Sequence, residues 1–279
     1  MIISDFSRRV PKDFNLYLLG DAHVGNGAMA EKPLWTAVNM IKDDDKGFCI
    51  TGGDMCEAIH LGDKRFEPAV HMGKYATADK QAAHVAALLD PIQGKVLAAL
   101  DGNHELKYAN IVDYTDLWCR RLDNKIKRGG YSIKAKFSKD FRLFYHHGMG
   151  SVNSRAGDRR QMETNDGISI KRKLRHLMGD CNVMAMAHIH KLRICPPIDS
   201  MALVGDGKLS HIYPSDVVSK DGYIPEDYRW FCSTGSFLTT FVDNVTTYSE
   251  RAMYSPTEIG MMKITVEKGR AVAVDKVIL

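Results

Sequence analysis

The sequence lacks the features that define several classes of protein. No apolar run is long enough to span a bilayer, and residues 1–12 carry four charged side chains where a signal peptide would have an apolar core. The six cysteines form no Cys-x-x-Cys pair, and the formal net charge is only +4. These absences predict a cytoplasmic protein with free thiols and no membrane partner, whose charge does not by itself indicate nucleic acid.

The chain also has no internal repeat, low-complexity tract or proline-rich linker that would mark a boundary between domains. A chain of 279 residues with 44% hydrophobic content can bury a large core. We therefore expect a single domain that covers residues 1–279.

Short apolar runs and helical periodicity alternate along the first half. We expect strands over residues 15–19, 48–51 and 96–100, and helices over 31–42, 65–89 (one or two) and 111–122. In the second half we expect an antiparallel hairpin over 131–137 and 141–145, a helix over 168–178, a strand over 183–187 and a closing pair over 262–266 and 271–277. The predicted fold class is α/β, in an α+β layered form: a two-sheet β-sandwich core flanked by helices.

Polar side chains follow five of these apolar strands directly. They are Asp21 and His23, Asp54, Asn103 and His104, His146 and His147, and His188 and His190. Active sites of layered α/β proteins lie beyond the carboxyl ends of strands, so these side chains should converge. In extended backbone, side chains two positions apart point to the same face. The two members of each Asp-x-His or His-x-His pair would therefore lie on one face.

Such a set suits two metal ions that share one carboxylate. Two ions about 3.5–4 Å apart can hold both the attacking and the leaving oxygen of a phosphate ester. Asp54 follows the Gly52-Gly53 turn, where no side chain crowds it, and is the candidate for the bridging ligand. Cys56 is more simply explained as a small residue packed behind this turn, because hard oxygen and imidazole ligands surround it.

In this order, five motifs resemble those of the calcineurin-like metallophosphoesterases. They are Gly20-Asp21-x-His23, Gly53-Asp54-x-x-Glu57, Gly102-Asn103-His104-Glu105, His147-Gly148 and His188-x-His190. Together they span most of residues 20–190. The loop with His146-His147-Gly148 and the segment from Thr234 to Phe237 are most similar to small phage- and prophage-encoded members.

The resemblance implies two divalent metal ions, Mn²⁺ first, with Fe or Zn as alternatives. One ion would be held by Asp21, His23 and His190, and Asp54 would bridge to a second held by Asn103, His147 and His188. It also implies that His104 is the general acid, and that Glu57 and Glu105 support the ligands. A hydroxide held by the two ions would be the nucleophile.

Two positions depart from the family pattern or leave a choice. Ala187 replaces the usual glycine before the last motif, which the turn can accommodate if the backbone there keeps a negative φ. His146 duplicates the fourth motif. We favour His147, which directly precedes glycine, and expect His146 to point to the other face of the strand.

The implied activity is hydrolysis of a phosphate ester, by a phosphodiesterase or phosphatase that acts on nucleotides or small phosphoesters. A DNA exonuclease or endonuclease is the alternative, and a non-catalytic scaffold on the same fold is a weaker one because every expected ligand type is present. Arg155, in the loop after His147, is a candidate contact for the substrate phosphate, although a solvated loop explains it equally well. The oligomeric state is open.

Overall fold

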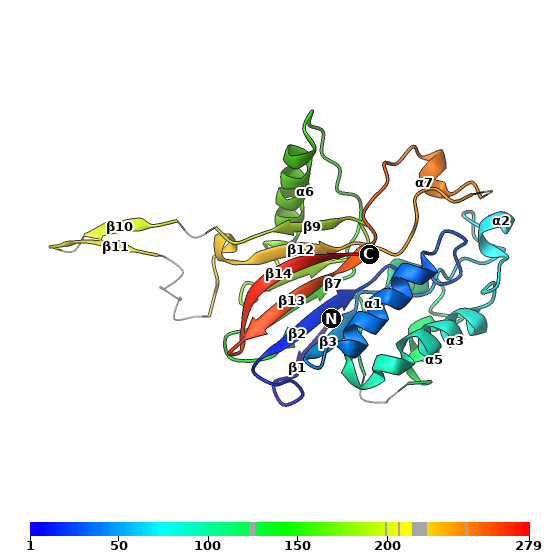
Figure 1. Cartoon of the computed structure of the whole chain (residues 1–279), viewed down its shortest axis with the longest axis horizontal. Helices are drawn as coiled ribbons and strands as arrows, with labels where there is room; N and C mark the ends of the chain where they lie inside the picture. The colour runs from blue at the N-terminus through cyan, green and yellow to red at the C-terminus, as the bar shows by residue number, and fades with distance from the viewer. Residues whose placement is uncertain (123–125, 199, 206, 214–221, 244) are drawn as a thin grey trace.

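The structure is a computed structural model that describes residues 1–122, 126–198, 200–205, 207–213, 222–243 and 245–279. Two six-stranded mixed sheets form its centre, and helices cover their outer faces (Figure 1). The strands are β1 (Ile2–Asp5), β2 (Phe14–Leu19), β3 (Gly47–Thr51), β4 (Val96–Ala99), β5 (Lys127–Arg128), β6 (Ser132–Lys136), β7 (Arg142–His146), β8 (Val183–Met186), β9 (Leu192–Cys195), β10 (Ala202–Gly205), β11 (Leu209–Ile212), β12 (Trp230–Thr234), β13 (Gly260–Glu267) and β14 (Arg270–Ile278). The helices are α1 (Glu31–Asp43), α2 (Pro68–His71), α3 (Ala78–Leu89), α4 (Asn103–Lys107), α5 (Tyr114–Cys119), α6 (Arg159–Leu174) and α7 (Tyr248–Arg251), with 3-10 turns η1 (Asp90–Lys95) and η3 (Glu226–Tyr228).

Strand direction in the two sheets brings several strand ends together. One sheet has the order β14-β13-β2-β3-β4-β5, in which β2, β3 and β4 run parallel. The other has the order β1-β6-β7-β8-β12-β9, in which β7 and β8 run parallel. Because parallel strands end at the same edge of a sheet, the residues that follow β2, β3 and β4 are neighbours, as are those that follow β7 and β8.

The alternation of side chains along β2 shows why the sheets stack. Leu16 and Leu18 point into an apolar cluster that includes residues of both sheets, such as Val183 and Ala185 of β8. Tyr17 and Leu19 point the other way, into a cluster shared with α1, α3 and α5. Both faces of the strand are buried, which explains its continuous apolar sequence.

Helices cover the outer face of each sheet through apolar side chains that they direct inward. The inward side of α1 carries Leu34, Ala37, Val38 and Ile41, spaced as a helical face requires. On the other sheet, Ile170 of α6 packs in a third cluster with Phe144, Met184 and Phe231. The layered α/β fold with two sheets and flanking helices is therefore confirmed.

Several helix boundaries differ from those predicted. Residues 65–89 form two helices, and the chain continues past Leu89 as η1, with Pro91 in the first turn. The helix expected over 111–122 is the shorter α5, because Asp113 caps it and Ile111 is exposed. The helix expected over 168–178 begins at Arg159, where Asp158 accepts a hydrogen bond from the Gln161 amide, and it ends at Leu174.

The hairpin of β10 and β11 was not predicted from the sequence. It extends away from the two sheets (Figure 1). Strands β1 and β9, at the two edges of one sheet, were also missed, because they are largely exposed or half-buried and lack the continuous apolar run of the buried strands. Within the described residues, no helix combines the length and the apolar character needed to cross a membrane.

Candidate metal centre

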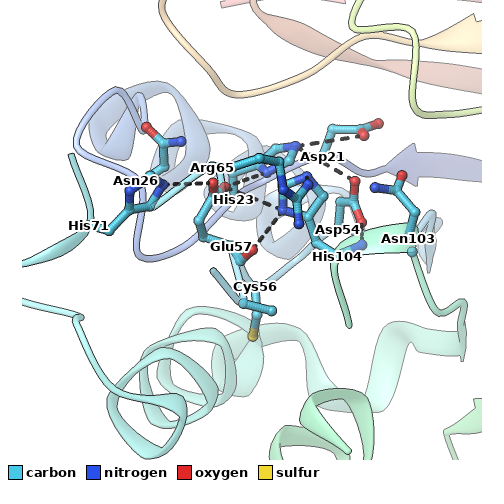
Figure 2. Close-up of polar contacts among 12 residues, drawn as sticks. Asp21, His23, Asn26, Asp54, Cys56, Glu57, Arg65, His71, Asn103 and His104 are labelled. Atoms are coloured by element: carbon cyan, nitrogen blue, oxygen red, sulfur yellow. Dashed lines mark hydrogen bonds and ion pairs between the residues drawn. The ribbon is translucent and has the colours of Figure 1, made fainter. Parts of the chain in front are cut away.

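The polar residues predicted at the strand ends lie together at one edge of the sandwich. Asp21 and His23 follow β2, Asp54 follows β3, Asn103 and His104 begin α4 after β4, His147 follows β7, and His188 and His190 follow β8. Backbone hydrogen bonds join these loops: the Asp21 amide donates to the Gly53 carbonyl, and the His23 amide to the Asp54 carbonyl. Figure 2 shows the part of the site around His23, Asp54 and His104.

Asp21, His23 and His190 form one group whose ligand atoms all lie within 4.8 Å of one another, and which could hold a metal ion. Nε2 of His190 is 3.2 Å from Nε2 of His23 and 3.4 Å from Oδ1 of Asp21. Nδ1 of His23 donates to the Glu57 carboxylate over 2.7 Å. This bond leaves Nε2 of His23 as the nitrogen that faces Asp21 and His190, which is the orientation a ligand needs.

Asp54, His147 and His188 form a second group of the same kind. Nε2 of His147 lies 3.3 Å from Oδ2 of Asp54 and 3.0 Å from Oδ1 of Asn103. Nδ1 of His147 donates to the Gly52 carbonyl over 2.8 Å, so Nε2 is again free to face the group.

Asp54 belongs to the second group and also lies next to the first. Its Oδ2 is 3.9 Å from Nε2 of His23 and 3.3 Å from Nε2 of His147, while its Oδ1 accepts a hydrogen bond from the His104 amide. One carboxylate is therefore held by the backbone of α4 while it borders both groups.

The electrostatics of the site favour positive charge at two of the buried histidines, His23 and His147. Burial lowers the pKa of His23, but the hydrogen bond to Glu57 and the charges of Asp54 and Asp21 outweigh it and raise that pKa to about 9. Burial also lowers the pKa of His147, and Asp54 raises it to about 9. A field that holds a proton on buried imidazole also attracts other cations. The carboxylate and imidazole donors thus fit divalent metal ions.

The two histidines of the fourth motif point in different directions. His146 is the last residue of β7, and its Nδ1 accepts a hydrogen bond from the Gly148 amide over 2.7 Å. Its ring lies against Tyr131. His147, in contrast, is fully buried beside Asp54. The structure therefore favours His147 as the candidate ligand.

We had expected extended backbone at the site. Instead, the backbone is left-handed at five positions. Positive φ angles, from 49° to 71°, occur at Asp21, His23, Asp54, His188 and His190. The pairs converge because both members turn sharply after a strand, not because they alternate along one. Ala187 does not share this conformation, so alanine is tolerated there.

Glu105 accepts hydrogen bonds from the backbone of two turns that carry candidate ligands. Its Oε2 accepts hydrogen bonds from the amides of Asp54 and Gly102, both over 2.9 Å, and its Oε1 accepts one from the amide of Cys56 over 3.0 Å. A Cβ at Gly102 would lie less than 3.0 Å from the Asp54 carboxylate and backbone. Cys56 itself packs in the apolar cluster behind the turn, as expected.

Glu57 supports the histidines on the other side of the site. It accepts hydrogen bonds from His23 and from Nε2 of His71, the latter over 3.2 Å. His23, Glu57 and His104 also lie close enough to hold a metal ion. Because Glu57 already binds Nδ1 of His23, we interpret it as the group that orients the ring.

His104 has one ring nitrogen engaged by the backbone and one turned outward. Nδ1 donates to the Glu57 carbonyl over 2.6 Å, and Nε2 lies 3.2 Å from Nη1 of Arg65 (Figure 2). The sequence did not indicate Arg65, which belongs to no motif. Arg155, the predicted phosphate contact, is exposed in the loop before α6, and no described residue pairs with it.

The comparisons with known proteins identify no family. No protein-family model matches the chain, and no curated protein matches it. Among solved structures, Vps29 of Chaetomium thermophilum is 10% identical, with a TM-score of 0.41, over 95% of this chain and 97% of that one. The NAD nucleotidase NadN of Haemophilus influenzae is 9% identical, with a TM-score of 0.41, over 96% of this chain and 50% of that one. The chain thus spans half the length of NadN. Likenesses this weak define neither family nor activity, so the function has to be inferred from the site.

Proposed function

We propose that this chain is a calcineurin-like metallophosphoesterase, which hydrolyses phosphate esters with two divalent metal ions. The position of Asp54 supports this most directly, because its Oδ2 lies near an imidazole nitrogen of each group, His23 in one and His147 in the other. A shared carboxylate between two mixed imidazole and oxygen sites is the arrangement that a dinuclear hydrolase needs. The likeness to phage-encoded members remains a prediction.

The ligands are assigned by proximity. One ion would be bound by Asp21, His23 and His190, the other by Asn103, His147 and His188, and Asp54 would contact both. When bound, the ions supply activation of water and neutralisation of phosphoryl oxygens. We propose Mn²⁺, with Fe or Zn as alternatives, since carboxylate, amide and imidazole donors suit all three.

His104 is the proposed proton donor. Its Nδ1 is held by the Glu57 carbonyl, so Nε2 is the nitrogen that can reach a leaving oxygen. Burial lowers the pKa of His104, which makes its protonated ring a stronger acid than a solvated imidazolium. A proton that Nε2 takes up once the substrate is bound would therefore pass readily to the leaving alkoxide.

The proposed substrates are nucleotides or small phosphoesters. Nucleic acid is the second candidate, because α6 carries exposed cationic side chains and one of them contacts the loop after His147. Nζ of Lys173 in α6 is 3.3 Å from the Met149 carbonyl, just beyond His147, and Arg160 and Arg172 of the same helix are exposed. Such side chains could bind phosphates of a longer substrate.

Two variants test the proposal. Asp54→Ala should lose turnover and most of the bound metal, since it removes the carboxylate whose Oδ2 lies near His23 of one group and His147 of the other. His104→Ala should lose turnover by about 10²- to 10⁴-fold and keep its metal. Metal per chain is measured by plasma mass spectrometry, and turnover on an aryl monoester, an aryl diester, cyclic nucleotides, and single- and double-stranded DNA.

The outcomes separate the alternatives. Full activity of Asp54→Ala under saturating manganese would end the proposal. Turnover of DNA alone would favour a nuclease. An inactive wild-type protein with every metal offered would instead favour a non-catalytic scaffold.

A further inference from the structure

We propose that Arg65 binds the phosphoryl group of the substrate beside His104. This inference rests on the proposed function and adds a residue that no motif contains. Arg65 lies in the segment between Glu57 and α2, and its guanidinium lies over the site next to His104 (Figure 2).

Arg65 is held in place by a buried carboxylate. Asp63 is only 5% exposed, and its Oδ2 accepts a hydrogen bond from Nη2 of Arg65 over 2.9 Å. Oδ1 of Asp63 accepts from Nε and from the backbone amide of Arg65, over 3.2 and 2.9 Å. The edge of the guanidinium formed by Nε and Nη2 is thus engaged, and Nη1 is directed toward His104.

The same carboxylate connects Arg65 to the helix that carries the site. Oδ2 of Asp63 also accepts hydrogen bonds from Nζ of Lys107 over 2.7 Å and from the hydroxyl of Tyr108 over 3.0 Å. Lys107 is the last residue of α4, the short helix that begins with Asn103 and His104. Arg65 is therefore fixed relative to these two residues although it comes from a separate loop.

In the free chain Nη1 of Arg65 contacts Nε2 of His104, and an anion can replace this contact. Because Nδ1 of His104 donates to the Glu57 carbonyl, neutral His104 offers Arg65 only the lone pair of Nε2. A phosphoryl oxygen carries negative charge and accepts a stronger hydrogen bond from guanidinium. The Arg65 side chain is 35% exposed, so a ligand can reach it from solvent.

This geometry distinguishes Arg65 from Arg155. Arg155 is exposed on the loop before α6, and none of the described contacts fixes its side chain. Binding by Arg155 would have to order a long flexible side chain, whereas Arg65 is already placed by Asp63. Preorganised donors lose less entropy when the anion binds.

The test compares Arg65→Ala and Arg65→Lys with Arg270→Ala as the matched control. Arg270 is the first residue of β14 and is 72% exposed. It lies at the opposite end of the sheet, where β13 pairs with the start of β2. Inorganic phosphate binding to manganese-loaded protein is measured by calorimetry, kcat/KM on an aryl phosphate in parallel, and folding by circular dichroism.

Arg65→Ala should weaken phosphate binding and lower kcat/KM by about 10- to 100-fold, the usual effect of losing a hydrogen bond to a charged group. Arg65→Lys keeps the positive charge but lacks the paired N–H donors of guanidinium, so its phosphate affinity and kcat/KM should lie between those of Arg65→Ala and the wild type. Arg270→Ala should match the wild type. Wild-type phosphate affinity in Arg65→Ala, or a loss in Arg155→Ala instead, would overturn the assignment. Wild-type protein that binds phosphate but hydrolyses no ester would overturn the proposed function, while the binding data would still decide the role of Arg65.

Discussion

Glu105 offers a direct test of how the site is assembled. The side chain is buried and connects the turn after β3 to the start of α4 through its three bonds to backbone amides. Glu105→Gln keeps the size and shape of the side chain but replaces one acceptor oxygen with an NH₂ group. The remaining oxygen can keep the hydrogen bonds from the amides of Asp54 and Gly102. The new NH₂ group then faces the amide N–H of Cys56, and two donors meet without an acceptor.

The magnitude follows from this loss. A buried N–H without an acceptor costs roughly 1–3 kcal/mol. Burial and the charge of Asp54 raise the pKa of Glu105 to about 8, so the side chain is largely neutral at pH 7 and the substitution removes little charge. We therefore expect the free energy of unfolding to fall by about 2 kcal/mol.

Thermal unfolding followed by circular dichroism measures this change. For a chain of this size, about 2 kcal/mol corresponds to a fall in Tm of roughly 4 °C. Glu226→Gln is the control, because Glu226 makes a partly exposed ion pair with Arg175 and its loss should cost about 0–1 kcal/mol. A Tm of Glu105→Gln within 1 °C of the wild type would show that the three amides do not depend on the carboxylate.

Two further predictions concern the same region. Gly102→Ala should weaken metal binding at least about tenfold, because the new Cβ would meet the Asp54 carboxylate. The control is Gly94→Ala, whose Cβ would meet nothing within 4 Å and which should bind metal normally. Equal metal content of the two variants in equilibrium dialysis would refute this. Hydrogen bonds from Arg65 and Lys107 hold the pKa of Asp63 well below its usual range. The stability they provide is complete above the unfolded pKa of about 4 and is lost as pH falls below it, by about 1 kcal/mol at pH 3. The Tm difference between wild type and Asp63→Asn should therefore shrink between pH 6 and pH 3, and a constant difference would contradict the assignment.

The fold and the position of the site could be predicted from local patterns. The strands that deliver ligands are short apolar runs buried on both faces, and each ends in a glycine or polar turn, so their positions could be read without knowing their partners. Helix boundaries were less predictable. The N-terminus of α6 depends on Asp158 as a cap, and its first two turns are largely exposed and show no apolar period.

The conformation of the ligands was not predictable from spacing. Alternation in a strand was the wrong reason for expecting Asp21 and His23 to converge, since both have left-handed backbone. Aspartate and histidine adopt this conformation more often than most residues, but a sequence does not show where a strand stops and the turn begins. The turns are set by contacts between loops, such as the bond from the His23 amide to the Asp54 carbonyl.

Arg65 shows most clearly what sequence patterns omit. Its position depends on Asp63, which also binds Lys107, a residue 44 positions further along the chain at the end of α4. Hydrophobic periodicity reports only residues that pack in the core. Arg65 and Lys107 do not, so no periodic pattern links them. Arg155 was the better candidate by sequence, since it follows a ligand motif directly, yet it is exposed and unsupported. A cation becomes a binding group when a buried carboxylate restricts its orientation, and that depends on tertiary contacts rather than on distance from a motif.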